Sequence, residues 1–118
     1  MENGLLIDMT SYPLRTRWVM DDVIVADTTQ ALLLKEGGYK PILYVPIVDV
    51  NKDVLIPNTR TSNCPHKGEA CYWDYQDQGK TVADVAWAYL TPISSAALIK
   101  DHMAFYEHLF DWVCTQYR

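Results

Sequence analysis

The sequence predicts a mainly β domain, and three observations support this fold class. Two β-rich runs flank the pair Asp21-Asp22, which is typical of a hairpin because aspartate tolerates the positive φ of a tight turn. A second pair of β-rich runs flanks the polar, glycine-containing segment 76–80. A short apolar run, Ile42-Leu43-Tyr44-Val45, stands between Pro41 and Pro46 and indicates a further strand.

The N-terminal third of the chain contains an arm, a hairpin and one ambiguous segment. Residues 1–14 have no sustained period, so we expect a loosely attached N-terminal arm followed by a single domain over residues 15–118. The first hairpin comprises residues 15–20 and 23–26. Thr28 is a candidate N-cap for a helix that ends before Gly37-Gly38, but so short an apolar run does not discriminate a helix from a strand.

The C-terminal half begins with the second hairpin, over residues 70–75 and 81–90. Its second strand alternates, so we expect one face to carry Ala83, Val85, Trp87 and Tyr89 and the other to carry Val82, Asp84, Ala86 and Ala88. After Pro92, Ser94 or Ser95 is a candidate cap for a short helix through Lys100. Apolar residues at helical spacing from Leu98 to Trp112 extend this helix toward the C-terminal end on periodicity alone.

Length and composition indicate one globular domain. The chain has 118 residues, of which 49% are hydrophobic and 12% aromatic, enough to bury a core without metals or disulfides. Its 15 acidic and 10 basic residues give a net charge of -5, and the basic residues are scattered. We therefore expect no nucleic-acid partner, because binding to a phosphate backbone requires a basic surface.

The sequence also indicates a cytoplasmic protein without a membrane span. No apolar run approaches the roughly 18 residues that a spanning helix needs, and the first twelve residues lack the apolar core of a secretory signal. Three cysteines, Cys64, Cys71 and Cys114, are an odd number, which argues for free thiols in a reducing compartment. The oligomeric state does not follow from these patterns.

The richest stretch for chemistry runs from Cys64 to Trp73, with the sequence Cys-Pro-His-Lys-Gly-Glu-Ala-Cys-Tyr-Trp. Cys64 is a candidate nucleophile because a cation such as Lys67 stabilises a thiolate, and a small buried thiol is the favoured alternative. Lys67-Gly68 is a candidate anchor for an anionic group, since glycine permits close approach of a ligand and lysine supplies the charge. A solvated lysine on a tight turn is the alternative for this pair.

Aromatic residues end this stretch and recur at strand spacing in the next predicted strand. Tyr72, Trp73, Trp87 and Tyr89 are candidate ligand contacts, although at least half of them are expected to fill the core. An open face of Trp87 and Tyr89 beside Lys67-Gly68 would form an aromatic wall with one polar anchor, a common composition for a small-molecule pocket.

We predict no metal and no cofactor. Cys64, His66 and Cys71 with His102 or Cys114 match no usual zinc spacing, and no Cys-x-x-Cys pair occurs in the chain. The calcium-like start at residues 49–53 has Val54 where the turn glycine belongs.

Several separated segments together resemble one family. They are, in chain order, Val25-Ala26-Asp27-Thr28, Tyr44-Val45-Pro46 with Asp49-Val50, Cys64-Pro65-x-Lys67-Gly68-x-Ala70-x-Tyr72-Trp73, Trp87-x-Tyr89 before Pro92, and Ala104-Phe105-Tyr106. From about Arg15 to about Trp112, the chain resembles a family of small, mostly bacterial single-domain proteins, catalogued as a domain of unknown function and labelled nucleotidyltransferase-like.

The resemblance implies a β-tent, in which two antiparallel sheets pack together, with one or two short helices near the C-terminus. It implies strands at residues 31–36 and 102–106, where periodicity alone suggests helix. The nucleotidyltransferase-like label has little support from the residues, because nucleotidyl transfer uses convergent carboxylates and a phosphate cradle, and no Asp-x-Asp pair is present.

Three functions stay open at this stage. The favoured one is binding of a small planar or anionic ligand in an aromatic-lined pocket beside the Cys64–Trp73 stretch. The second is a thiol-dependent or nucleotidyltransferase-like enzyme, with Cys64 as the candidate catalytic residue. The third is a protein-interaction module that presents exposed aromatic side chains.

Overall fold

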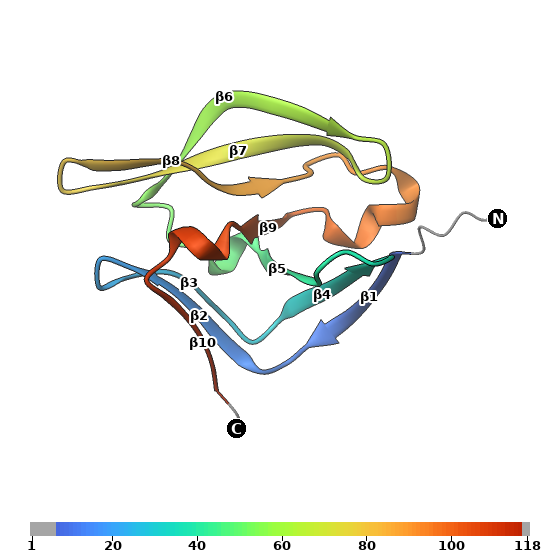
Figure 1. The fold of residues 1–118 in the computed structure, drawn as a ribbon, viewed down its shortest axis with the longest axis horizontal. Coiled ribbons are helices and arrows are strands. Elements are labelled where there is room, and N and C mark those ends of the chain that lie inside the picture. The colour runs from blue at the N-terminus through green and yellow to red at the C-terminus, as the bar shows by residue number, and fades with distance from the viewer. Residues whose placement is uncertain (1–6, 117–118) are drawn as a thin grey trace.

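The structure, a computed structural model, describes residues 7–116 and consists almost entirely of antiparallel strands (Figure 1). A seven-stranded sheet has the order β1 (Ile7–Tyr12), β4 (Ala31–Glu36), β5 (Ile42–Pro46), β9 (His102–Phe105), β8 (Lys80–Ala88), β7 (Gly68–Asp77) and β6 (Leu55–Cys64). A three-stranded sheet has the order β10 (Trp112–Gln116), β2 (Arg15–Met20) and β3 (Val23–Thr28). The predicted mainly β fold with two packed antiparallel sheets is confirmed.

Helical structure within residues 7–116 is limited to short 3-10 segments, which are η1 (Ile47–Asp49), η2 (Ser94–Ile99) and η3 (Glu107–Leu109). None of them is long and apolar enough to cross a bilayer. The short helix predicted near residue 96 is present as η2, but neither predicted serine caps it. Ile93 precedes η2, and no side chain hydrogen-bonds to its N-terminus.

Both predicted hairpins are present. Strands β2 and β3 are joined by Asp21 and Asp22, whose φ angles of 51° and 64° show that the aspartates adopt the left-handed turn conformation. Strands β7 and β8 are joined by Gln78 and Gly79, with φ angles of 52° and 80°. Figure 1 shows the β7–β8 hairpin extending well beyond the body of the sheet.

Pairing with neighbouring strands decides the secondary structure of the segments that periodicity left ambiguous. Residues 31–36 form β4 between β1 and β5, and residues 102–105 form β9 between β5 and β8. These strands confirm the expectations drawn from the family resemblance. The helix predicted by periodicity toward residue 112 is wrong, because β9, η3 and β10 occupy that stretch and β10 pairs with β2.

The N-terminal segment is also corrected. Residues 1–6 of the predicted arm lie outside the described residues, whereas Ile7–Tyr12 form β1 and pair with β4 from Ile7 opposite Glu36 to Tyr12 opposite Ala31. A strand paired along its whole length is an integral part of the sheet, so these residues are not a loose arm.

The alternation expected along residues 82–89 is interrupted by a bulge in β8. Val82 pairs with Tyr75 and Ala86 pairs with Trp73, so residues 83–85 oppose Asp74 alone. Asp84 has a φ of 55°, and its backbone N–H donates to the Asp74 carboxylate at 3.0 Å. Val85 and Ala86 are both fully buried as a result, although they are adjacent in the chain.

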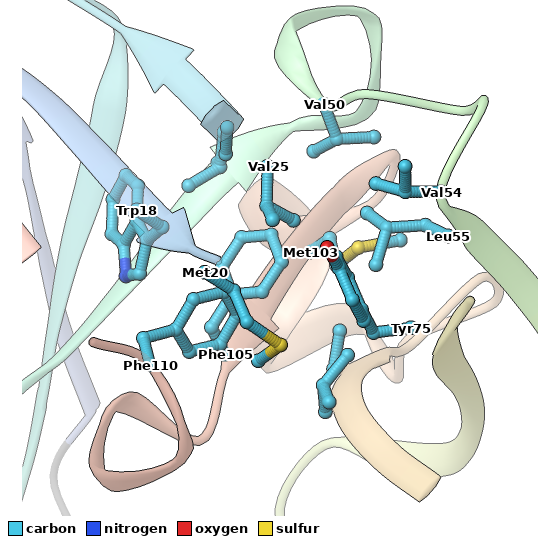
Figure 2. Packing of buried hydrophobic residues seen from close by; sticks show 14 residues of the cluster. Trp18, Met20, Val25, Val50, Val54, Leu55, Tyr75, Met103, Phe105 and Phe110 are labelled. Carbon is cyan, nitrogen blue, oxygen red and sulfur yellow. The ribbon is translucent and has the colours of Figure 1, made fainter. Parts of the chain in front are cut away.

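The main core lies between the two sheets (Figure 2). Trp18 and Val25 from the small sheet pack there with Tyr75, Met103 and Phe105 from the large sheet. Trp18 and Phe105 have ring centres 5.4 Å apart. Burial of these large apolar side chains, each worth roughly 1.5–3 kcal/mol, holds the small sheet against the large one.

Candidate ligand-binding site

The turn between β6 and β7 is clamped to the chain that follows β8. The backbone N–H of Lys67 donates to the Cys64 carbonyl at 3.2 Å, and the Lys67 carbonyl accepts from Ile93 N–H at 2.9 Å. Gly68 has a φ of 120°, and a Cβ at this position would lie 3.3 Å from the Thr91 carbonyl oxygen. Glycine therefore suits this position, because any other side chain would be strained at this φ and would crowd the Thr91 backbone.

Lys67 forms a buried ion pair with Glu36. Its Nζ lies 2.5 Å from Glu36 Oε1, and the two side chains are only 8% and 9% exposed. Glu36 ends β4, whereas Lys67 follows β6 at the far edge of the sheet, so the sheet must curl strongly to bring them together. The Lys67 charge is matched within the protein, and its Nζ also lies 3.8 Å from the Cys64 Sγ.

Five aromatic side chains gather on the face of the large sheet that points away from the main core; we call it the aromatic face. They are Tyr44, Tyr72, Trp87, Tyr89 and Tyr106. The strand register produces this arrangement, because Tyr72 pairs with Trp87 and Trp87 pairs with Ala104 on the next strand. Small residues between the rings, such as Ala104, leave room for them to lie close together.

The rings of the aromatic face differ in exposure. Tyr44, Tyr72 and Tyr89 are buried, while Trp87 and Tyr106 are half-buried. The Trp87 and Tyr106 ring centres are 4.5 Å apart, and the Trp87 and Tyr44 ring centres are 6.4 Å apart. Trp87 and Tyr106 are thus the aromatic surface that solvent or a ligand can reach.

Polar side chains from β6 and β8 border these rings. The Arg60 guanidinium carbon lies 4.5 Å from the centre of the Tyr72 ring, and Arg60 Nη1 lies 2.6 Å from Asp84 Oδ2. Asn58 donates to the carboxylates of Asp74 and Asp84 at 2.6 and 2.8 Å. The β8 bulge holds Asp84 in this network, so the bulge fixes Arg60 above Tyr72.

Hydrogen bonds and burial shift several pKa values at the site. The hydrogen bond from Arg60, followed by that from Asn58, lowers the pKa of Asp84 below its usual range. Burial raises the pKa of the Tyr44 and Tyr89 hydroxyls well above their ordinary value. The Tyr44 hydroxyl is fully buried and has no hydrogen-bond partner within the described part of the chain.

The structure brings most of the predicted site residues to one region. Cys64, Lys67 and Tyr89 lie together at the β6–β7 turn, because Lys67 Nζ is 5.9 Å from the Tyr89 ring centre. Tyr72 and Trp87 lie on the same face farther along the sheet. Trp73 does not join them, because side chains alternate along β7 and Trp73, next to Tyr72, packs against the main core on the opposite face.

Sequence reasoning missed four residues of this region. Tyr44 and Tyr106 occur in segments that carry the family resemblance, so that signal could have identified them. Arg60 lies in β6, a strand that the sequence analysis did not predict, and Glu36 was assigned only to an ambiguous segment. Only pairing between strands that are distant in the chain could place Arg60 beside Tyr72 and Glu36 beside Lys67.

We searched the described residues for clusters of side chains that could bind a metal ion. Within residues 7–116, no three His, Cys, Asp or Glu side chains lie close enough together to hold a metal ion. Cys64, Cys71 and Cys114 are free thiols and partly buried.

Comparison with known proteins places the chain in a family without assigning an activity. A comparison with curated proteins finds no match. A family model described as a domain of unknown function (DUF427), with a nucleotidyltransferase-like label, matches residues 8–116. Because this match covers nearly the whole chain, the protein belongs to the DUF427 family.

Proposed function

We propose that this domain binds a small planar ligand against the half-exposed rings of Trp87 and Tyr106. The observation that carries the proposal is the pairing of these rings, with centres 4.5 Å apart on a face whose other rings are buried. Flat aromatic surfaces accept planar molecules by stacking, and Trp87 and Tyr106 are the two rings of this face that are only partly buried.

A small hollow beside Tyr106 supports the proposal. Its volume is about 180 Å³, and its lining includes Tyr106 together with the charged or titratable residues Lys40, Glu107 and His108. Lys40 is exposed and makes no ion pair within the described part of the chain, unlike Lys67. A planar ligand with an anionic substituent therefore has an available cation at Lys40, whereas Lys67 would first have to release Glu36.

A ligand screen with matched variants tests the proposal. Nucleosides, planar heterocycles and aromatic carboxylates would be screened by ligand-observed NMR, and the affinities of hits measured by calorimetry. Loss of a stacking ring costs roughly 1–3 kcal/mol, so Trp87→Leu and Tyr106→Leu should each weaken binding about tenfold or more. Trp112→Leu is the control, because Trp112 is 54% exposed on the small sheet.

The proposal fails if no planar compound binds, or if Trp112→Leu weakens binding as much as Trp87→Leu. Circular dichroism of each variant would separate loss of the site from loss of the fold. Lys40→Ala should weaken only ligands that carry an anionic group.

One observation favours a second candidate, a thiol-dependent enzyme. The Cys64 Sγ lies 3.8 Å from Lys67 Nζ, and Lys67 in turn contacts Glu36, which places a nucleophile, a cation and a carboxylate in sequence. The test is the rate of alkylation by iodoacetamide at pH 7, followed by mass spectrometry. If Cys64 reacts no faster than Cys71, or if Lys67→Met leaves its rate unchanged, this candidate is rejected.

A further inference from the structure

An apolar cavity lies on the side of the large sheet opposite the aromatic face. Its volume is about 350 Å³, within the range of roughly 300–1,000 Å³ that is typical of ligand pockets. Buried Val50, Leu55 and Met103 contribute to its lining and belong to the main core. Figure 2 labels these three residues along one border of that core.

Trp73 supplies an aromatic wall to this cavity. It was predicted as a ligand contact of the Cys64–Trp73 stretch, and the strand register turns it away from Tyr72 and toward this cavity. Ile56 also lines the cavity and is 37% exposed, so its side chain lies where the cavity opens to solvent. The cavity thus presents a nearly continuous apolar surface to solvent.

A single charge interrupts this apolar lining. Among the residues of segment 7–116 that line the cavity, Lys52 alone is charged, and none is a carboxylate. Lys52 is exposed and makes no ion pair within the part of the chain that the structure describes. Its ammonium is therefore available to an anionic group that approaches the rim.

We propose that this cavity binds a small amphipathic monocarboxylate, with its apolar body against Trp73 and Met103 and its carboxylate near Lys52. The apolar lining selects for a hydrocarbon or aryl body, because each buried methylene leaves water for an apolar environment. The single exposed lysine selects for one anionic group at one end of the molecule. This site is separate from the aromatic face and does not depend on the function proposed there.

A homologous series of ligands gives the first test. Linear carboxylates from butanoate to dodecanoate, used below their micellar concentrations, would be titrated by calorimetry or by amide chemical shifts. The dissociation constant should fall about fourfold for each added methylene until the cavity is filled, and then become constant. The primary alcohols of equal length should bind several-fold more weakly than the carboxylates, since they lack the charge.

Variants give the second test. Lys52→Ala should weaken carboxylates about three- to fivefold and leave the alcohols unchanged, whereas Lys100→Ala, at another exposed lysine, should change neither. Ile56→Trp should obstruct the rim and abolish both kinds of binding. Trp87→Leu should have no effect, which separates this site from the aromatic face.

The proposal is overturned by any of three results. These are the absence of saturable binding by every member of the series, an equal effect of Lys52→Ala and Lys100→Ala, and unchanged binding in a folded Ile56→Trp variant. A chain-length dependence without a plateau would also overturn it, because it would indicate adsorption to the surface instead of entry into a cavity of fixed volume.

Discussion

Removing the Lys67 charge should destabilise the domain far more than removing an exposed lysine charge. Lys67 and Glu36 are 8% and 9% exposed, and their charged atoms are 2.5 Å apart. Lys67→Met keeps most of the side-chain length but leaves the Glu36 carboxylate buried without its partner. Breaking a buried pair in this way costs about 3–5 kcal/mol.

The matched control is Lys80→Met. Lys80 likewise pairs with a carboxylate, that of Asp21, at 2.8 Å, but these side chains are 51% and 42% exposed. An exposed pair contributes little to stability because water screens it. Two ion pairs of similar geometry should therefore differ by several kcal/mol in the stability that they provide.

Urea unfolding followed by tryptophan fluorescence measures both losses. The double variant Glu36→Leu/Lys67→Met is the decisive third measurement, because it replaces the whole pair by apolar side chains. It should regain most of the stability that Lys67→Met loses, since the uncompensated carboxylate is gone. Equal losses for Lys67→Met and Lys80→Met, or no recovery in the double variant, would refute the reasoning.

Three further predictions concern the backbone and the shifted pKa values. Gly68→Ala should cost about 1–3 kcal/mol in urea unfolding, because φ is 120° there, and Gly38→Ala should be nearly neutral because nothing lies within 4 Å of its added Cβ. The hydrogen bond from Arg60 lowers the pKa of Asp84 in the folded protein. The stability that the ionised Asp84 carboxylate provides is therefore present above 3.8, the pKa of the unfolded chain, and is lost as pH falls through the lower pKa of the folded protein. Asp84→Asn should therefore flatten the acid side of the plot of urea midpoint against pH, and an unchanged profile would contradict this. Burial raises the pKa of the Tyr44 hydroxyl in the folded protein. The stability that depends on the neutral hydroxyl is therefore fully present below the ordinary pKa of 10.0 and is lost as pH rises above that value. Tyr44→Phe should reduce the loss of stability between pH 9 and pH 11.

Local patterns were sufficient where a turn and its strands are consecutive in the chain. The Asp21-Asp22 pair identified the first hairpin, because the side chains that tolerate positive φ are few and the flanking runs favour strands. The glycine-containing turn at residues 78–79 identified the second hairpin for the same reason.

Local patterns failed where distant strands decide the structure. Residues from Leu98 to Trp112 repeat at helical spacing, yet they form η3 and parts of β9 and β10, because β5, β8 and β2 offer hydrogen-bonding edges to them. Strand β6 was not predicted because its residues are mostly polar and exposed, as expected for a strand at the edge of a sheet.

In the candidate site, too, local patterns predicted some features and contacts between distant strands decided the others. Alternation along a strand already placed Trp87 and Tyr89 on one face, and the suggestion that this face lies beside Lys67-Gly68 was a hypothesis built on it. The sequence could not show that Lys67 is paired, because Glu36 approaches it only through the curl of a seven-stranded sheet. Alternation also puts the neighbours Tyr72 and Trp73 on opposite faces, but the sequence could not show which of the two faces carries the main core.

The sequence by itself determined that this chain is a mainly β domain of the DUF427 family, because turn residues, strand periodicity and family motifs are local properties. Only the tertiary structure decided what the residues between Cys64 and Trp73 do. It paired Lys67 with Glu36, brought the Thr91 backbone close to Gly68, and assigned one face of the aromatic strands to the main core and the other to the aromatic face. The physical reason is that charge pairing, close backbone approach and burial depend on strands that are distant in the chain and meet only when the sheet curls.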